Sequence, residues 1–278
     1  MPIFLISLNK AVMKYNKAIV YMIISVIAFA IMNAVVKYLS FFNAYQIVFF
    51  RSIGTLLFTI PLILRYRIPI LGNNKKLLLV RGAAGVISLT LFFQSLNYLD
   101  VGTAVSLRYT SPIFAAILAL IFLKEKIKSM QWLLFLVAFV GVLFVKGFGT
   151  TINLLGLLLV ILSALFLGLI FVVIRKMGTK DNPLVIINYF MVMAFIFGGV
   201  MSINHWRNPN TIEWILLLSL GVFGHAGQLY MTKAFQTQET SLIAPIKYLE
   251  VIFMIVIGAT WFGEIYDFWT LFGIFLIL

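Results

Sequence analysis

Long apolar segments recur along the whole chain, and this feature constrains the fold more than any other. Each is close to the ~20 residues that an α-helix needs to cross a ~30 Å hydrocarbon core. Short polar stretches such as RYRIPILGNNKK separate them. Because a helix satisfies its own backbone hydrogen bonds in lipid, we expect an all-α polytopic membrane protein. The ten expected transmembrane helices are 17–39, 43–64, 77–98, 101–123, 130–146, 153–174, 183–203, 212–233, 240–262 and 266–278.

Only 10% of the residues are charged, yet the net charge is +13, which raises the question of a nucleic-acid partner. If the N-terminus is cytoplasmic, fourteen basic residues fall on the cytoplasmic side and three on the outer side. This distribution follows the positive-inside rule, so we expect cytoplasmic N- and C-termini and no nucleic-acid partner. The fourteen are Lys10, Lys14, Lys17, Arg65, Arg67, Lys75, Lys76, Lys124, Lys126, Lys128, Arg175, Lys176, Lys180 and Lys233, and the three are Lys37, Lys146 and Arg207.

The chain also matches itself at a shift of 139 residues. We therefore expect two repeats of five helices, residues 15–147 and 153–278. Because five is odd, the second copy crosses the membrane in the opposite sense, and such inverted repeats suit alternating access. The fifth helix ends near Lys146, so its copy is expected to be cut short at Leu278. The shift aligns Lys37 with Lys176, Asn43 with Asn182, Gly82 with Gly221, Gly85 with Gly224, Asp100 with Glu239, Arg108 with Lys247, Tyr109 with Tyr248, Phe114 with Phe253 and Glu125 with Glu264.

Two stretches carry a resemblance to a known family, RGAAGVISLTLFFQSLNYLDVGTAVSLRYTSPIFAAILALIFLKEKI and GHAGQLYMTKAFQTQETSLIAPIKYLEVIFMIVIGATWFGEIYDFWTLFG. With Pro112 and Glu125 in the first and FGE at residues 262–264 in the second, the chain resembles the EamA-type ten-helix branch of the drug/metabolite transporter superfamily. The resemblance covers nearly the whole chain as two EamA units. It implies a secondary transporter of small organic metabolites, often amino acids. Val251 stands where the second unit would carry its proline, and Pro245 comes earlier, which leaves the bend of the ninth helix open.

Charged groups inside spans are functional candidates, because they are costly in lipid. Arg108 follows Asp100 by eight residues and Lys247 follows Glu239 by eight. Each cation therefore lies ~12 Å into its helix, from opposite faces of the membrane. Two cations near the midplane suit a substrate carboxylate; the alternative is that each side chain extends to its own interface.

Glu250 lies three residues after Lys247, on the same helix face. We expect an ion pair for which the substrate or a proton competes, with a static pair that joins two helices as the alternative. Tyr109 and Tyr248 stand beside the cations and are candidates to line the cavity or to pack against it. Pro112 and Pro245 interrupt backbone hydrogen bonding and are candidate hinges.

Further polar side chains within spans complete the candidate site: Asn33, Gln94, His225 and Gln228. Hydrogen bonding between helices is the alternative for each, and His225 is also a candidate proton relay. Arg81 is expected to extend to the cytoplasmic interface. For Arg51, a helix–helix bond and a cavity role both remain open.

Two more groups of residues have expected structural roles. Glu125 and Glu264, at the ends of the fourth and ninth helices, are expected to cap the next helix, with a gate salt bridge as the alternative. Gly221, Gly224 and Gly227 are expected to allow close helix packing.

The sequence argues against an enzyme. It contains no cysteine, H-E-x-x-H, P-loop or G-x-S-x-G motif. We therefore expect no catalytic residue, cofactor, bound metal or ATP-driven pumping by this chain alone. The expected function is a permease of a bacterial inner or plasma membrane for an amino acid or related carboxylate. Its expected partners are the substrate, the lipid bilayer and protons, in a monomer or homodimer. A passive facilitator, a carrier of a cationic metabolite such as S-adenosylmethionine, and a helical membrane assembly protein are the alternatives.

Overall fold

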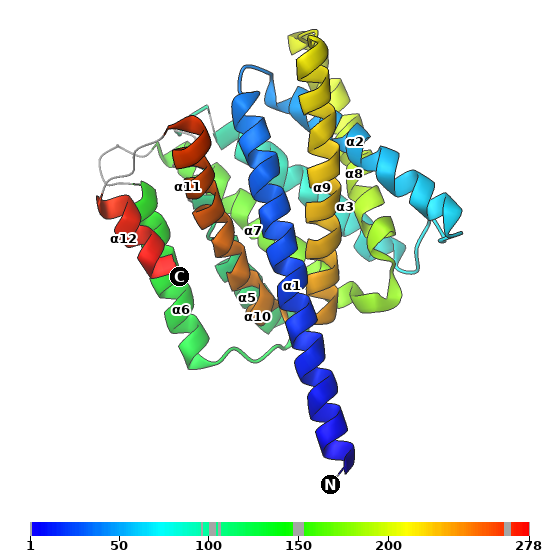
Figure 1. Cartoon of the computed structure of the whole chain (residues 1–278), viewed down its shortest axis with the longest axis vertical. Coiled ribbons are helices and arrows are strands. Elements are labelled where there is room, and N and C mark those ends of the chain that lie inside the picture. Colours follow the sequence, from blue (N-terminus) through cyan, green and yellow to red (C-terminus); the bar gives the residue numbers. More distant parts are fainter. Residues whose placement is uncertain are drawn as a thin grey trace.

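The computed structural model is a bundle of helices, with no strand among the residues that it describes, which are 2–95, 97–99, 104, 107–146, 153–263 and 268–277 (Figure 1). The helices are α1 (Pro2–Tyr38), α2 (Ala44–Arg65), α3 (Lys75–Ser95), α5 (Ser111–Leu123), α6 (Ser129–Lys146), α7 (Leu154–Met177), α8 (Pro183–Ser202), α9 (Thr211–Thr237), α10 (Thr240–Ile243), α11 (Leu249–Phe262) and α12 (Phe268–Ile277), with short 3₁₀ turns η1 (Gly178–Lys180), η2 (Ile203–His205) and η3 (Ala244–Tyr248).

Seven segments in the described part are long and apolar enough to cross a membrane, and two shorter apolar helices, Ser111–Leu123 and Ser129–Gly141, accompany them. An integral membrane protein is therefore confirmed, whereas the count of ten helices stays a prediction. The seven are Asn16–Tyr38, Ala44–Arg65, Lys75–Ser95, Leu154–Lys180, Pro183–His205, Thr211–Thr237 and Thr240–Phe262.

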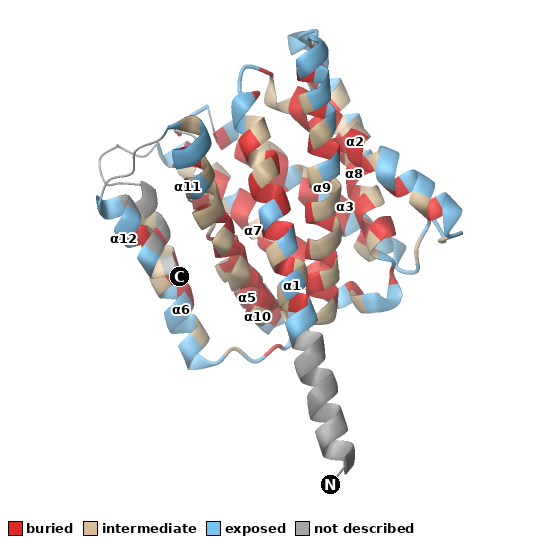
Figure 2. Ribbon diagram, viewed as in Figure 1, coloured by how far each residue is buried: buried red, intermediate tan, exposed pale blue. Residues whose placement is uncertain are grey.

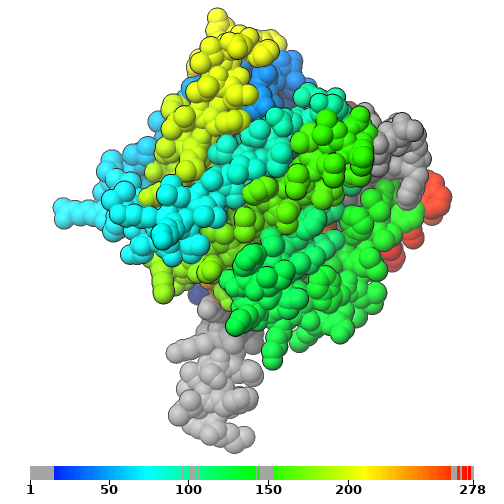
Figure 3. All heavy atoms as spheres, turned by 180° about the vertical axis from the view of Figure 1, so that it is seen from behind, coloured from blue at the N-terminus to red at the C-terminus, as the bar shows by residue number. Residues whose placement is uncertain are grey.

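Each of the seven segments has one packed face and one outward face. Between 39% and 50% of its most apolar window is buried. The outward faces carry large apolar side chains such as Leu57, Val200 and Val256, which suit contact with lipid tails. Figure 2 shows buried positions gathered between the helices and exposed positions around them. In Figure 3, seen from behind, the cyan-to-green segments of the first half cover much of the surface, and red α12 lies at one edge.

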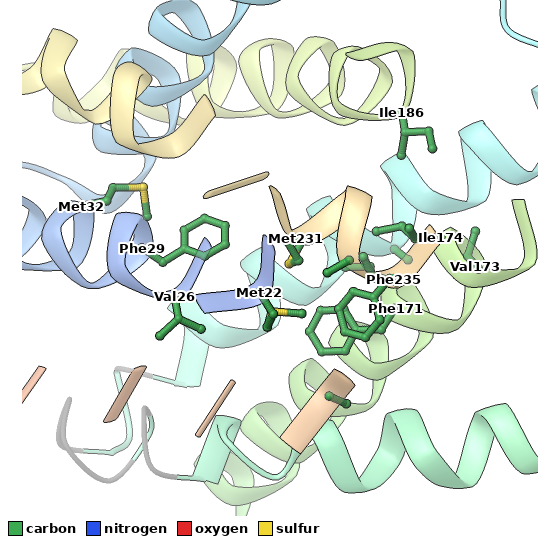
Figure 4. Close-up of a cluster of buried hydrophobic side chains, with 14 of the residues drawn as sticks. Met22, Val26, Phe29, Met32, Phe171, Val173, Ile174, Ile186, Met231 and Phe235 are labelled. Atoms are coloured by element: carbon green, nitrogen blue, oxygen red, sulfur yellow. The ribbon is translucent and has the colours of Figure 1, made fainter. Parts of the chain in front are cut away.

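The core joins the two halves of the chain. α1 packs on α9, α3 packs on α7, and α2 packs on α8, while α6 and α12 form a separate pair. Buried side chains from α1, α7, α8 and α9 meet in the cluster of Figure 4, where Phe171 and Phe235 stack with ring centroids 4.4 Å apart. The closest packing therefore occurs between segments that are distant in sequence.

Glycines allow the helix backbones to touch, as the sequence led us to expect. A Cβ on Gly221 would lie 2.3 Å from the Cα of Gly54, so α2 and α9 cross in direct backbone contact. A Cβ on Gly227 would lie 2.7 Å from the ring of Phe29. Small residues at such crossings let membrane helices gain dispersion contacts that larger side chains would block.

Two local structures recur at the spacing of the sequence repeat. α5 ends at Lys124 and α11 ends at Gly263, both with left-handed backbones, and each cap N–H bonds back to a carbonyl, of Ala119 and Gly258 respectively. N-cap asparagines Asn43 and Asn182 likewise start α2 and α8, each accepting the N–H two residues on.

A pair of buried serine hydrogen bonds follows the same pattern. Ser25 of α1 donates to the carbonyl of Gly227 at 2.7 Å, and Ser163 of α7 donates to the carbonyl of Ser88 at 2.7 Å. Ser88 and Gly227 are positions that the shift of 139 superposes. The same bond thus links α1 to α9 and α7 to α3.

The fourth and ninth segments differ from continuous helices. The expected helix 101–123 lies partly outside the described residues, and α5 begins at Ser111. Pro112 therefore occupies the first turn of α5, where its missing N–H removes no intrahelical bond. The segment 240–262 is broken into α10, η3 and α11, and Pro245 lies in the first turn of η3.

Candidate functional site

The break in the segment Thr240–Phe262 places Lys247 and Glu250 in the interior. Lys247 lies in the 3₁₀ turn η3, and Glu250 lies in the first turn of α11. Both are buried, with side chains 9% and 8% exposed. Discontinuous helices at membrane depth free backbone groups and often line binding sites in transporters. The interruption therefore identifies this pair as the centre of the candidate site.

Each oxygen of the Glu250 carboxylate accepts a hydrogen bond from a different element. Lys247 Nζ donates to Oε2 at 3.1 Å, and Asn33 Nδ2 of α1 donates to Oε1 at 2.9 Å. The expected ion pair is thus present, and Asn33 reaches it from 217 positions away in sequence. The carboxylate ties the second half of the chain to α1 of the first half.

Aromatic rings surround the ammonium group of Lys247. Its Nζ lies 5.1 Å from the ring centroid of Phe29 and 5.9 Å from that of Phe171. Both rings belong to the buried cluster of Figure 4. Ring faces attract a cation at such distances, so they stabilise the charge without a second carboxylate.

Arg108 and Tyr109 face the same carboxylate from the first half. The guanidinium of Arg108 lies 4.3 Å from the ring centroid of Phe92, and both Arg108 and Tyr109 lie within electrostatic range of Glu250. Tyr109 also packs against a buried cluster that contains Tyr248. The structure therefore brings the two sequence-matched cation–tyrosine pairs to one region.

Arg51 of α2 is a further member that the sequence left undecided. It is half-buried, and its charge lies within range of Arg108 and Glu250. Its side chain rests against Gly224, where a Cβ would lie 3.3 Å from Nε. A glycine opposite a charged residue on the neighbouring span is the sequence signal that points to this contact.

The prediction for Arg81 is wrong: the side chain does not extend to the interface. It is 1% exposed, donates from Nη2 to Gln228 Oε1 at 3.0 Å, and lies 4.5 Å from the ring centroid of Phe190. Gln228 is therefore paired within the bundle, as an interhelical hydrogen bond. Arg81 remains inside because an amide and an aromatic face replace water around its charge.

The remaining candidates lie apart from Glu250. His225 packs near Phe58 of α2 at a ring-centroid distance of 5.8 Å, and Phe58 is itself 43% exposed. The side chain of Gln94 is exposed and makes no hydrogen bond to any described residue. Neither residue contacts the carboxylate in the described part of the chain.

A carboxylate closes one end of the bundle between the two halves. Glu125, just after α5, accepts the N–H groups of Thr240 and Ser241 at 3.2 and 3.3 Å and pairs with Arg175 at 3.4 Å. It caps α10 of the second half, whereas a cap on the next helix was expected. The expectation for Glu264 lies outside the described residues.

Hollows lie at both ends of the bundle. A cavity of about 550 Å³ is lined by Glu125, Arg175 and Glu239 among others. At the other end, one of about 280 Å³ is lined by Tyr38, Arg207 and Glu213 among others. Among the described residues, no group of three or more His, Cys, Asp or Glu is placed to hold a metal ion.

Comparisons with known proteins agree with this arrangement. The model of the EamA-like transporter family matches residues 16–147 and 154–278. The pseudopaline exporter CntI of Pseudomonas aeruginosa is 32% identical over 250 residues, covering 88% of this chain and 87% of that protein. The S-adenosylmethionine uptake transporter of Rickettsia bellii is 25% identical and covers 98% and 94% respectively. One solved crystal structure shares the fold, with a TM-score of 0.83 at 12% identity over 95% of both chains.

Proposed function

Because this chain belongs to the EamA-like transporter family, we propose that it carries a small organic metabolite with an amine and a carboxylate across the cell membrane. The substrate binds at Glu250, and the protein works by alternating access. The observation that carries this proposal is the Glu250 carboxylate, held between Lys247 and Asn33 at the break in a membrane span.

The charges around Glu250 suit an amino acid. A substrate amine can replace the Lys247 ammonium at the carboxylate, and the released Lys247, together with Arg108, can bind the substrate carboxylate. Charge-assisted hydrogen bonds of this kind are about twice as strong as neutral ones. Because three cations, Arg51, Arg108 and Lys247, face one carboxylate, the site favours a neutral zwitterion or an anion over a net cation.

A cationic metabolite is the second candidate, supported by the match to the S-adenosylmethionine uptake transporter. That compound carries an amino-acid end and a sulfonium cation, so its amine or sulfonium would approach Glu250. The surplus of cations at the site favours the first candidate.

Alternating access requires two halves that can exchange conformations. The serine hydrogen bonds of Ser25 and Ser163, and the matching helix ends at Lys124 and Gly263, support an inverted repeat. The excess of basic residues on one side supports cytoplasmic termini in a bacterial plasma membrane. In this orientation Glu125 closes the cytoplasmic end, so the halves separate there when the site opens inward.

Transport by the purified protein in proteoliposomes tests the proposal. Labelled amino acids are presented with and without a pH gradient, to wild type, Glu250→Gln and Glu239→Gln. Glu239 is the matched control, because it begins the same segment and its side chain makes no cap hydrogen bond. We expect transport that the gradient accelerates, loss of that acceleration in Glu250→Gln, and wild-type behaviour in Glu239→Gln.

Other outcomes separate the alternatives. Gradient-independent transport that Glu250→Gln leaves unchanged would make Glu250 structural and the protein a facilitator. Transport of S-adenosylmethionine alone would support the second candidate. Absence of transport for every amino acid would remove this substrate class and retain only the family.

A further inference from the structure

Arg81 is a buried cation whose hydrogen-bonding capacity is mostly unused. Only Nη2 has a partner, Gln228 Oε1, whereas Nε and Nη1 are buried without one in the described part of the chain. Gly85 leaves room at this place, since a Cβ there would lie 3.0 Å from Nη1. A guanidinium has five donors, and leaving several unmet in a low-dielectric interior is costly.

Arg51 lies next to Arg81 along the same helix. Arg51 rests against Gly224 of α9, and Arg81 bonds to Gln228, four positions further on. Four residues correspond to a rise of about 6 Å, close to one helical turn. The two positive charges lie within electrostatic range, and Nε of Arg51 is also buried without a hydrogen-bond partner among the described residues.

No carboxylate of this chain compensates the two arginines. Of the eight acidic residues, seven (Asp100, Glu125, Asp181, Glu213, Glu239, Glu264 and Asp267) occur at the ends of the expected spans or between them. The eighth, Glu250, already accepts from Lys247 and Asn33. Two like charges one turn apart repel each other, and the protein interior screens them poorly. The compensating anion must therefore come from outside the chain.

We propose that Arg51 and Arg81 form a second anion-binding subsite that takes an additional carboxylate of the transported substrate. This inference rests on the proposed function and narrows its substrate class to amino acids with at least two carboxylates. The amine binds Glu250, one carboxylate binds Lys247 and Arg108, and the other binds between Arg51 and Arg81. Half-buried Arg51 connects the subsite to the central carboxylate, because it lies within range of Glu250 on one side and of Arg81 on the other.

Matched amino-acid pairs test the subsite. L-glutamate and L-glutamine, like L-aspartate and L-asparagine, have nearly the same shape but differ by one carboxylate. The full chain is purified into phosphatidylcholine nanodiscs, which carry no net charge, so an anionic lipid cannot occupy the arginines. Apparent dissociation constants are measured from the ligand dependence of thermal unfolding.

We expect wild type to bind each acid at least about 10-fold more tightly than its amide, as for one charge-assisted hydrogen-bonded pair. In Arg81→Gln this ratio falls toward one, and in Arg81→Lys part of it remains. Arg65→Gln is the control, because it removes an exposed arginine at the end of α2 and should keep the wild-type ratio. Should Arg81→Gln fail to fold, Arg51→Gln provides the same comparison.

Three results would overturn the inference, and they differ from failure of the proposed function. Equal binding of acid and amide to wild type contradicts the subsite but not amino-acid transport. An undiminished ratio in Arg81→Gln or Arg51→Gln places the preference elsewhere. Tighter binding of the acids only after anionic lipid is added would assign the arginines to a lipid headgroup. Binding of neither member of any pair contradicts the amino-acid substrate class itself.

Discussion

Arg108 and Lys247 occupy matching positions 139 residues apart, yet their surroundings differ. Lys247 has a carboxylate at 3.1 Å, three positions further along its own segment. The position three residues after Arg108 holds Ser111, and the guanidinium lies against the ring of Phe92 without an ion pair in the described part of the chain. The two halves share a backbone plan, but the second alone supplies the acidic group of the site.

This difference separates what the scaffold needs from what the substrate needs. Features that set helix ends and crossings recur in both halves, such as the left-handed caps at Lys124 and Gly263. A single carboxylate gives the site one location for a positive group and leaves several cations for negative groups. Duplication therefore provides the frame, and divergence within it provides the polarity of binding.

The largest expected effect compares the matched glycines Gly221 and Gly82. A Cβ on Gly221 meets the backbone of Gly54 at 2.3 Å, which cannot move aside without separating α2 and α9. A Cβ on Gly82 meets the flexible thioether of Met193 at 2.5 Å. Gly221→Ala should lower the free energy of unfolding by more than about 3 kcal/mol, and Gly82→Ala by about 1 kcal/mol. Thermal unfolding in detergent measures both, and equal losses would contradict the distinction.

The next effect compares the two cations directly. Lys247→Met leaves Glu250 buried with Asn33 as its remaining donor, so we expect a loss of about 3 kcal/mol. Arg108→Met removes a contact with a ring face and should cost about 1 kcal/mol. The double variant Lys247→Met/Glu250→Leu should recover most of the stability in the same unfolding assay. A double variant less stable than Lys247→Met would show that the carboxylate stabilises the fold by other contacts.

A smaller effect concerns the Glu125 contact that joins the halves. Glu125→Gln weakens its acceptance of the Thr240 and Ser241 N–H groups and its pair with Arg175. The closed end should open more often, by about 5-fold for a loss of about 1 kcal/mol. Because the chain contains no cysteine, Ser241→Cys gives a single site whose maleimide labelling rate reports this opening. Labelling as slow as in Ser241→Cys alone would mean that Glu125 caps a helix without holding the halves together.

The smallest effect compares the matched tyrosines. Tyr109 lies within range of Glu250, whereas the hydroxyl of Tyr248 is buried without a partner in the described part of the chain. Tyr109→Phe should slow transport about 3-fold, in line with one neutral hydrogen bond, and Tyr248→Phe should stay within about 2-fold. Transport rates in proteoliposomes measure the difference. A larger loss in Tyr248→Phe would mean that the free hydroxyl binds substrate.

Local sequence predicted the parts that depend on neighbours along the chain. The three-residue spacing of Lys247 and Glu250 predicted their ion pair, and the glycines of α9 predicted close packing. Arg81 was misassigned because distance from a helix end does not reveal which neighbouring helix covers the residue. Its partners, Gln228 and Phe190, lie more than 100 positions away.

The same limit applies to the broken helix. Pro245 indicated a disturbance, but a proline alone does not distinguish a bend from a change to 3₁₀ geometry. Nor does it reveal that Asn33 of α1 would donate to Glu250 close to the break. Glu125 illustrates the same difficulty, since its position suited a helix cap but did not identify α10 as the helix. Pairings between the halves depend on the packed bundle, where one residue meets partners from several segments.

The crossing of Gly54 and Gly221 has a mechanical consequence. No side chains interlock at this point, so α9 can tilt against α2 as a lever turns on its fulcrum, with no ridges to disengage. The fulcrum is off-centre in the 27-residue helix Thr211–Thr237, with about 15 Å of helix on one side and about 24 Å on the other. A tilt of about 10° would move the Thr237 end by about 4 Å and the Thr211 end by less than about 3 Å. Unequal lever arms thus convert one small rotation into a larger displacement at one end of the bundle than at the other.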